Sequence, residues 1–488
     1  MDLIDKSLFK QECFINGQWI NSENNDTFDV INPSDQSVIG TMPNCKVKET
    51  LDAIKSAHNS WEKWRSLTGK ERSSYIRSWH ELIIKNIDDL SLIMTLENGK
   101  PLSDAKGEIL YASWFTDWFA EEAKRTYGKT IPSTMQGRRI ITIKQSIGVC
   151  GIITPWNFPA AMITRKVAPA LAAGCPVVIK PAGSTPFTAT ALVELAHRAG
   201  IPNGVINLIS VSENDVAEVG KELCTNENVR KISFTGSTNV GKHLMSLTAS
   251  TIKKVSMELG GHAPFIVFED ADLDEAIIGA MANKYRNSGQ VCVSANRIYV
   301  HEKIYDTFSK KLAEKSAELK VSDGRVEGAQ IGPLITENAL EKVDSHVKDA
   351  VDKGARILTG GNSDNAGSQF YKPTVLTEVT DSMKIYYEET FGPVAPIIKF
   401  KSEKEVIKMA NDTKYGLAGY FYSRDIGKIW RVAEELEYGM IGINAGVIST
   451  EVAPFGGIKE SGIGREGAAE GIDEYLETKY LCFDGVNK

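Results

Sequence analysis

One cysteine stands in a segment that favours a reactive thiol. Cys292 lies in residues 287–297, between a predicted helix and a predicted strand, and Gly289 and Gln290 precede it. These two residues break the helix just before Cys292, so the thiol is accessible and backbone N–H groups around it favour the thiolate. Residue types alone leave open whether Cys292 is a nucleophile or a buried structural cysteine.

Two other polar residues complete a set that could attack a carbonyl carbon. Glu258 lies between Met257 and Leu259 in an apolar, tight-turn segment, which predicts a buried carboxylate able to act as a general base. Asn157 lies in Thr-Pro-Trp-Asn-Phe-Pro (residues 154–159) after an apolar run, and its amide N–H suits a developing oxyanion. A solvated turn acid and an Asn-initiated turn are the alternatives.

A glycine-containing loop at residues 234–242 raises the question of phosphate binding. Gly236 and Gly241 are separated by four residues and a lysine follows, which nearly matches the P-loop of nucleotide triphosphatases. His243 stands where that loop needs Ser or Thr for magnesium, so we reject this function. A strand that leads into a helix at Gly236 and Ser237 still offers N–H groups and a positive dipole end to an anion. A plain turn capped by Ser237 fits equally well.

The elements that must position these residues predict an α/β fold with two domains meeting near residue 258. Short apolar runs alternate with helical stretches, which is typical of parallel sheets. Residues 46–127 have a helical pattern, and residues 128–147 alternate like a β-hairpin. The predicted strands are residues 148–153, 177–179, 205–209 and 231–234 in the first domain, and 265–268, 297–300, 396–400, 419–422 and 440–443 in the second.

The composition excludes several classes of protein. The chain has 488 residues, of which 42% are hydrophobic, so it is long enough for several domains and too apolar for a disordered chain. Its formal net charge is 56 − 63 = −7, which argues against a nucleic-acid binder. The longest nearly apolar run, residues 167–179, is interrupted by two prolines and is too short to span a membrane. Seven scattered cysteines without a Cys-x-x-Cys pair predict a cytoplasmic protein without disulfides or a metal site.

Seven short motifs follow one another along nearly the whole chain. They are Pro-Trp-Asn-Phe-Pro (155–159), Lys-Pro-Ala (180–182), Phe-Thr-Gly-Ser-Thr (234–238), Glu-Leu-Gly-Gly (258–261), Gly-Gln-Val-Cys (289–292), Glu-Glu-Thr-Phe-Gly-Pro (388–393) and Pro-Phe-Gly-Gly-Ile-Lys-Glu-Ser-Gly (454–462). Together they resemble the NAD(P)-dependent aldehyde dehydrogenase superfamily, and the resemblance is strongest to its succinate-semialdehyde dehydrogenases.

The resemblance implies an aldehyde dehydrogenase-like fold with two Rossmann-like α/β domains and a β-hairpin arm for oligomerisation. The implied cofactor-binding domain is residues 1–127 and 148–257, and the implied catalytic domain is residues 258–450. The implied arm is residues 128–147 and 466–488. Its apolar content predicts pairing with a sheet edge of another subunit in a homodimer or homotetramer.

The resemblance also implies a mechanism in which a cysteine captures the aldehyde. Cys292 would attack the carbonyl carbon, and Asn157 with the Cys292 N–H would stabilise the oxyanion. Loss of hydride to the nicotinamide would leave a thioester, which water activated by Glu258 would hydrolyse. Glu466 would assist with protons or positioning, and a helix-surface acid is its alternative.

The implied cofactor is NADP or NAD, held by residues of both domains. Lys180 would contact the adenosine ribose and Ser237 the pyrophosphate. Glu389 and Phe391 would hold the nicotinamide ribose and ring. The other implied cofactor contacts are Thr154, Pro155, Trp156, Ser184 and Gly236.

One departure from many NAD-preferring relatives concerns the adenosine ribose. Gly183 stands where those relatives carry a glutamate that accepts hydrogen bonds from the ribose. Without that carboxylate, Lys180 and Ser184 could bind a 2′-phosphate, so we expect NADP to be accepted or preferred. The acids of residues 210–215 oppose this preference if they face the cofactor.

The implied substrate is succinate semialdehyde, which would be oxidised to succinate. Arg165, Arg286 and Ser449 match the residues that clasp the distal carboxylate in succinate-semialdehyde dehydrogenases, and guanidinium groups suit a carboxylate. Phe158 and Phe455 are the other implied substrate contacts.

Alternatives to this substrate and to this activity stay open. The two arginines could be helix-surface residues paired with nearby acids. Glutarate semialdehyde, aminobutyraldehyde or betaine aldehyde could be the substrate of the same fold. A cysteine hydrolase without a cofactor is the alternative from another class, although no histidine neighbours Cys292 in the sequence.

Overall fold

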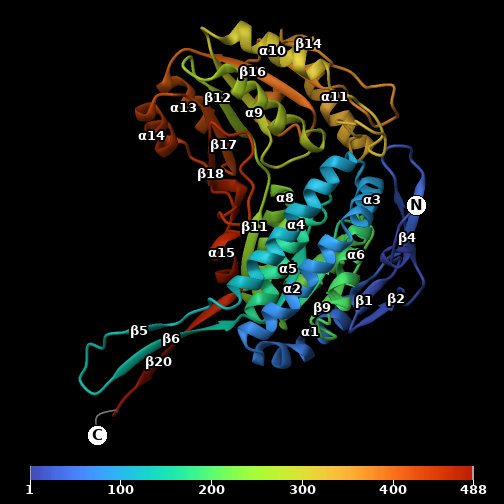
Figure 1. Cartoon of the computed structure of the whole chain (residues 1–488), viewed down its shortest axis with the longest axis vertical. Coiled ribbons are helices and arrows are strands. Elements are labelled where there is room, and N and C mark those ends of the chain that lie inside the picture. Colours follow the sequence, from blue (N-terminus) through green and yellow to red (C-terminus); the bar gives the residue numbers. More distant parts are fainter. Residues whose placement is uncertain (1, 486–488) are drawn as a thin grey trace.

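The computed structural model describes residues 2–485 and contains two large, helix-flanked β-sheets with a long arm at one end (Figure 1). This architecture confirms the predicted α/β fold. Residue 1 and residues 486–488, which end the predicted ranges 1–127 and 466–488, lie outside the described residues. Within residues 2–485, no helix is long and apolar enough to cross a membrane.

The first sheet has the strand order β19-β11-β10-β7-β8-β9-β1-β2, and its central strands are parallel. All four strands predicted for this domain are present. The fifth parallel strand, β11 (Lys254–Glu258), corrects one expectation, because Glu258 ends a strand and does not lie in a tight turn. The other strands are β1 (Cys13–Ile15), β2 (Gln18–Ile20), β7 (Val149–Ile153), β8 (Val177–Lys180), β9 (Ile206–Leu208), β10 (Val229–Thr235) and β19 (Gly462–Ile463).

Helices of the first half of the chain pack around this sheet (Figure 1). All 13 residues of α5 (Ala161–Ala173) are buried, and most are Ala, Leu, Ile and Val. A helix buried on all sides must be apolar all round, so its two cations, Arg165 and Lys166, need buried partners. The other helices are α1 (Val47–Ser66), α2 (Gly69–Lys85), α3 (Ile87–Asn98), α4 (Leu102–Glu122), α6 (Pro186–Arg198), α7 (Val216–Thr225) and α8 (Thr238–Thr248).

The second sheet has the order β14-β15-β16-β13-β12-β17-β18 and is parallel except between β14 and β15. Its five predicted strands are present, and β14 and β15 were not predicted. The strands are β12 (Ala263–Val267), β13 (Ala295–His301), β14 (Arg356–Thr359), β15 (Thr374–Thr377), β16 (Val394–Phe400), β17 (Ala418–Tyr422) and β18 (Met440–Ile443). The helices are α9 (Leu273–Tyr285), α10 (Tyr305–Ala317), α11 (Glu337–Asp352), α12 (Lys384–Tyr387), α13 (Glu403–Asn411) and α14 (Ile426–Glu435).

The arm is a three-stranded antiparallel sheet in which β6 (Arg139–Ser146) lies between β5 (Lys129–Ile131) and β20 (Leu476–Phe483). Figure 1 shows it extending away from both large sheets. α15 (Ala468–Asp473), which precedes β20, packs against α4 and α5 on the body of the protein. The remaining elements are the hairpin of β3 (Thr27–Ile31) and β4 (Val38–Pro43) and the short 3-10 helices η1 (Lys6–Leu8), η2 (Ala249–Thr251), η3 (Arg286–Gly289) and η4 (Lys459–Ser461).

Candidate active site

Strand direction brings the predicted site residues to one place. In a parallel sheet the carboxyl ends of all strands share an edge, and ligands bind there. At that edge of the first sheet lie the segment 154–159 after β7, Lys180 at the end of β8, Ser237 after β10 and Glu258 at the end of β11. The second sheet contributes the segments that precede its strands. Gly261 precedes β12, Cys292 precedes β13 and residues 389–391 precede β16.

Direct contacts join these two sets of segments. Asn157 Nδ2 donates a hydrogen bond to Gln290 O (3.0 Å), two residues before Cys292. The rings of Trp156 and Phe391 meet edge to face, with centroids 5.7 Å apart. The first contact joins the predicted oxyanion donor to the cysteine loop, and the second joins the two rings of the predicted nicotinamide wall.

The two glycines after Glu258 are explained by close approach. A Cβ at Gly261 would lie 2.3 Å from Cys292 O, so only glycine lets this backbone pass under the cysteine. Gly261 N also donates a hydrogen bond to Glu389 Oε1 (3.2 Å). The Gly-Gly pair therefore links the general-base candidate, the nucleophile candidate and the predicted nicotinamide-ribose contact.

The loop that carries Cys292 is held in an uncommon conformation. α9 ends at Tyr285, and Asn287 and Ser288 follow with positive φ angles of 48° and 56°. Asn287 Nδ2 donates to Asn157 O (2.9 Å), and Gln290 Oε1 accepts from a backbone N–H of the neighbouring segment (3.0 Å). Left-handed backbone at non-glycine residues costs free energy and persists where surrounding contacts impose it. The thiol is thus presented by a fixed loop.

The expected preference of Cys292 for the thiolate is wrong for the ligand-free protein. Burial raises the pKa of the Cys292 thiol to about 12. Arg165 and Arg286 lower this pKa, while Glu389 and Glu258 raise it further. Cys292 therefore rests as a thiol and would have to lose its proton to act as the predicted nucleophile.

Glu258 has the environment of a general base. Its side chain is 2% exposed, and Oε2 has no hydrogen-bond partner within residues 2–485. Burial raises the pKa of Glu258 well above its usual value, and the charge of Glu466 raises it further, against the effect of Arg165. A Cβ at Gly456 would lie 2.9 Å from Glu258 Oε1, so glycine there leaves room for the carboxyl group.

Two charged residues that we did not predict hold the Asn157 segment. Lys100 and Glu108 form an ion pair in which both side chains are 1% exposed. Lys100 Nζ also donates to Asn157 O (2.8 Å), and Glu108 Oε1 accepts from Ala160 N (2.9 Å) at the start of α5. Lys100 also lies over the ring of Phe158, 4.3 Å from its centroid. A buried pair that also bonds backbone groups fixes a segment in one conformation.

Glu466 does not lie on a helix surface. It is 4% exposed and forms ion pairs with Arg165 and Lys166, the two cations of buried α5. Burial raises the pKa of Glu466, but the two cations lower it more, so the net direction is downward. Arg165 also stacks on Phe455, with 4.2 Å between its guanidinium carbon and the ring centroid. Arg165 is therefore a buried residue with an acid partner, and its Nη2 has no partner within residues 2–485.

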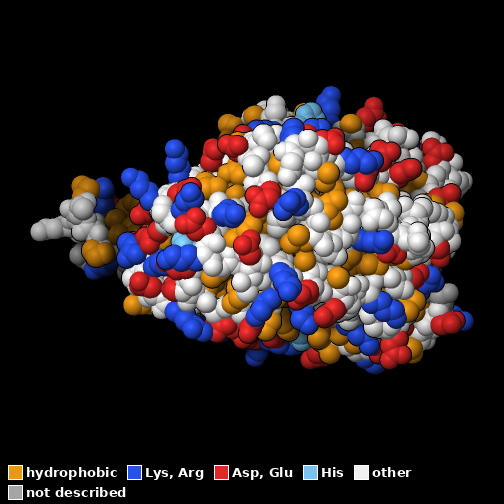
Figure 2. Space-filling model, turned by 90° about the horizontal axis from the view of Figure 1, so that it is seen from above, with side chains coloured by type: hydrophobic (Ala, Val, Ile, Leu, Met, Phe, Trp, Pro, Cys, Tyr) orange, Lys and Arg blue, Asp and Glu red, His pale blue; other side chains and the backbone are white. Residues whose placement is uncertain are grey.

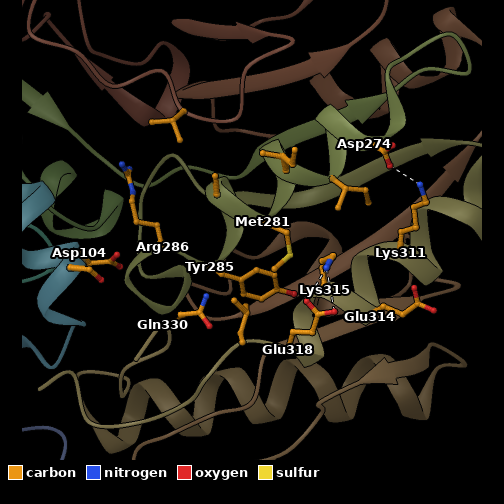
Figure 3. A pocket seen from close by; sticks show the side chains of 16 residues that line it. Asp104, Asp274, Met281, Tyr285, Arg286, Lys311, Glu314, Lys315, Glu318 and Gln330 are labelled. Carbon is orange, nitrogen blue, oxygen red and sulfur yellow. Dashed lines mark hydrogen bonds and ion pairs between the residues drawn. The ribbon is translucent and has the colours of Figure 1, made fainter. Parts of the chain in front are cut away.

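Arg286 lies between two cavities. An outer cavity of about 1200 Å³ lies between α9 and α10, and Figure 3 shows Arg286 at one end of it, near Asp104. A narrow inner space of about 10 Å³ is lined by Arg286, Ser449 and the two valines that flank Cys292. The guanidinium of Arg286 also lies over Phe158, 5.3 Å from the ring centroid. Arg286 and Ser449 thus line the same inner space beside the cysteine loop.

The residues at the carboxyl edge of the first sheet fit a dinucleotide. Ser237 caps α8 by accepting from Val240 N, and Gly236 N donates to Glu258 O (3.0 Å), so the other N–H groups at the start of α8 are the ones left for an anion. Thr154 Oγ1 is buried without a partner within residues 2–485. Burial lowers the pKa of Lys180 to about 8 and raises that of Glu389 to about 7. Buried polar groups that lack partners or have shifted pKa values are suited to a ligand that supplies hydroxyls and a phosphate.

The acids near the predicted 2′-phosphate contacts differ in whether they share a cavity with those contacts. Ser184, Gly183 and Glu213 line one cavity of about 360 Å³, and Glu213 also raises the pKa of Lys180 against the effect of burial. Asp215 instead forms an ion pair with Lys46 (2.6 Å). Of the acids that we expected to oppose NADP, Glu213 shares the cavity with Ser184 and Asp215 is already paired.

The comparisons with known proteins agree with this geometry. The model of the aldehyde dehydrogenase family matches residues 19–481. A glutarate-semialdehyde dehydrogenase from Pseudomonas putida is 57% identical, and a succinate-semialdehyde dehydrogenase [NADP(+)] from Escherichia coli is 54% identical, each alignment covering 99% of both chains. A solved succinate-semialdehyde dehydrogenase from Burkholderia pseudomallei is 54% identical, with a TM-score of 0.98 over 99% of this chain and 100% of that chain.

A match of this length shows the family, and the predicted resemblance is confirmed. A fixed cysteine loop, a buried carboxyl group beside it and an edge suited to a dinucleotide are the parts that such chemistry needs. The chain belongs to the aldehyde dehydrogenase family and is an oxidoreductase that oxidises aldehydes with NAD(P).

Proposed function

We propose that the chain oxidises succinate semialdehyde to succinate. The observation that carries the proposal is the buried guanidinium of Arg165, whose Nη2 has no partner, in a site that also contains Arg286 and Cys292. An unpaired buried donor on a cation favours an anionic ligand. The names of the Escherichia coli and Burkholderia relatives support the four-carbon semialdehyde, and the name of the Pseudomonas putida relative supports glutarate semialdehyde as second candidate.

The surface charge in view does not favour an anionic substrate. The net charge is −7, and Figure 2 shows Lys and Arg side chains mixed with Asp and Glu over the face in view. A surface of this kind does not steer anions over long distances. Recognition of a carboxylate then depends on Arg165, Arg286 and Ser449 inside the site, with Phe158 and Phe455 as the apolar walls on which the arginines stack.

In the proposed reaction the proton of Cys292 is released to solvent as its sulfur bonds to the aldehyde carbon. Asn157 Nδ2 has two N–H donors, and Gln290 O uses one of them. The second donor and the Cys292 N–H stabilise the oxyanion. The resulting thioester is hydrolysed by water that Glu258 deprotonates. Glu466 holds Arg165 and Lys166 in place.

The cofactor would be held by the groups at the two sheet edges. When bound, its nicotinamide accepts the hydride that leaves the captured aldehyde carbon. Trp156 and Phe391 would flank the ring, Glu389 would accept from the ribose, and Ser237 with Gly236 would bind the pyrophosphate at the start of α8. Thr154, Pro155, Lys180 and Ser184 would complete the contacts.

Replacing Arg286 with glutamine tests the carboxylate clasp. We expect R286Q to raise the KM for succinate semialdehyde roughly 10- to 100-fold, since a charge-assisted hydrogen bond contributes ~1.5–3 kcal/mol. The KM for butanal, which has four carbons and no charge, should change less than about threefold. Steady-state kinetics with both aldehydes measures the difference.

Three outcomes of that assay discriminate the alternatives. Equal losses for both aldehydes would refute the clasp. A wild-type preference for glutarate semialdehyde would favour the five-carbon substrate, and a preference for aminobutyraldehyde or betaine aldehyde would refute an anionic one. Product formation without nicotinamide reduction would indicate a hydrolase.

Glu213 gives a test of cofactor preference. We expect E213Q to raise kcat/KM for NADP+ about fivefold, because one less negative charge near a surface phosphate is worth ~1 kcal/mol. The value for NAD+, which lacks that phosphate, should stay within about twofold. D215N is the matched control, since Asp215 is already paired with Lys46. Unchanged NADP+ kinetics in E213Q would show that Glu213 does not face the phosphate.

The arm supports the proposal of a homodimer or homotetramer. Both outer strands of the arm sheet, β5 and β20, have one edge without a strand partner within residues 2–485. Such edges pair with other chains unless they are covered.

The strand orders of the sheets also support the proposed division of the chain. We propose a cofactor domain, a catalytic domain and an arm, with boundaries near residues 127, 148 and 258. Cytoplasmic location stays a prediction.

A further inference from the structure

A buried hydroxyl group faces the arginines of the site without a hydrogen-bond partner. Tyr111 lies in α4, which packs along α5, the helix that carries Arg165 (Figure 1). Tyr111 Oη is buried and has no partner within residues 2–485, and the same holds for Arg165 Nη2. A buried polar atom left unpaired costs ~1–3 kcal/mol. Two such atoms on neighbouring helices, close enough for Arg165 to lower the pKa of the Tyr111 hydroxyl, form a polar pair whose hydrogen bonds a ligand would complete.

The ring of Tyr111 is held in place, so the hydroxyl cannot turn to another partner. Phe115, one turn further along α4, meets it at 72° with ring centroids 4.9 Å apart. Trp114 meets it at 86° with centroids 6.2 Å apart. Edge-to-face contacts on two sides fix the direction of an aromatic side chain. The position of Oη is therefore a property of the fold.

The charges around Tyr111 decide what its hydroxyl can do. Burial raises the pKa of Tyr111, and Arg165 and Arg286 lower it without cancelling that effect, so the phenol keeps its proton at neutral pH. A hydroxyl beside guanidinium groups turns its oxygen toward them and its proton away. Its proton is then free to be donated to an anionic ligand that the two arginines also bind.

We propose that the Tyr111 hydroxyl donates a hydrogen bond to the distal carboxylate of the substrate and so helps to select anionic aldehydes. The inference deepens the proposed function and rests on it. A carboxylate has about four lone-pair sites. Arg165 Nη2, the guanidinium of Arg286 and Ser449 leave one of them for Tyr111.

Y111F tests the proposal because it removes only the oxygen atom. We expect the KM for succinate semialdehyde to rise roughly 10-fold, with kcat changed less than about threefold, since the lost bond is to a charged group far from the reacting carbon. The inhibition constant of succinate should rise by a similar factor. The KM for butanal should not change, and thermal unfolding of the variant should show that it is folded like the wild type.

Y371F is the matched control. Tyr371 Oη is also buried without a partner within residues 2–485, but it lies in the apolar core of the second sheet. Y371F should leave both aldehydes and succinate inhibition unchanged. Equal effects of Y111F on succinate semialdehyde and butanal, or no effect on either, would overturn the role of Tyr111. If wild-type protein itself shows no preference for succinate semialdehyde over butanal, the proposed substrate fails instead.

Discussion

C292A should lose at least about 10⁴-fold in aldehyde oxidation, because no other group can form the covalent intermediate. None of the other cysteines stands in this loop. Of the other six cysteines, five are buried in the protein and Cys482 lies on the arm. Reduction of NAD(P)+ followed by absorbance with succinate semialdehyde measures the loss.

C292S sharpens the same test. A serine hydroxyl is a far weaker nucleophile than a thiol, and the burial that raises the pKa of Cys292 to about 12 would disfavour an alkoxide still more. We expect C292S to lose nearly as much activity as C292A, and we expect cofactor binding, measured by fluorescence titration, to stay within about threefold of wild type. C482S, an exposed substitution on β20, should retain full activity. Substantial oxidation by C292A would mean that the chemistry does not depend on this sulfur.

The fold could be predicted because local sequence patterns mark its strands and helices, and because several motifs along the chain together indicate the family. Nine short apolar runs separated by helical stretches were enough for two parallel sheets, and seven ordered motifs were enough for the family. β11 was missed because its neighbouring glycines suggested a turn, although Val255 and Met257 alternate with polar residues as in a strand. β14, with three of its four residues exposed, has no hydrophobic pattern to read.

Long-range charge pairing within the site could not be predicted in the same way. Lys100 and Glu108 are eight residues apart on either side of a proline, and nothing in that spacing shows that they meet under Asn157. Arg165 and Lys166 did offer a signal, because two cations in an apolar helix require buried acids. Their partner, Glu466, is 300 residues away from Lys166, so only the fold identifies it.

The state of Cys292 shows why a loop position does not define a pKa. Backbone N–H groups near a thiol favour the thiolate, but that effect competes with desolvation. Burial prevails here, and the carboxyl groups of Glu389 and Glu258 act in the same direction. The sequence predicted Cys292 as the nucleophile, whereas its protonated resting state became evident only when the surrounding charges were known.

E258Q should convert a turning-over enzyme into one that stalls after its first hydride transfer. The amide keeps the shape of the side chain but cannot accept a proton, so hydrolysis of the thioester should slow roughly 10²- to 10⁴-fold. Rapid mixing should then show a burst of about one reduced cofactor per site, followed by a slow phase. Hydroxylamine attacks a thioester without a general base, so adding it should restore turnover. E477Q, on an exposed strand of the arm, is the matched control.

The pH dependence follows from the same environment. The pKa of Glu258 is raised well above its usual value, chiefly by burial, so at low pH the group is neutral and cannot act as a base. The wild-type rate should therefore rise with pH as Glu258 ionises, and it should rise over a higher range than for an exposed glutamate. In E258Q that rise should disappear from the slow phase. If E258Q showed neither a burst nor rescue by hydroxylamine and kept the wild-type pH profile, Glu258 would not be the base that releases the acid.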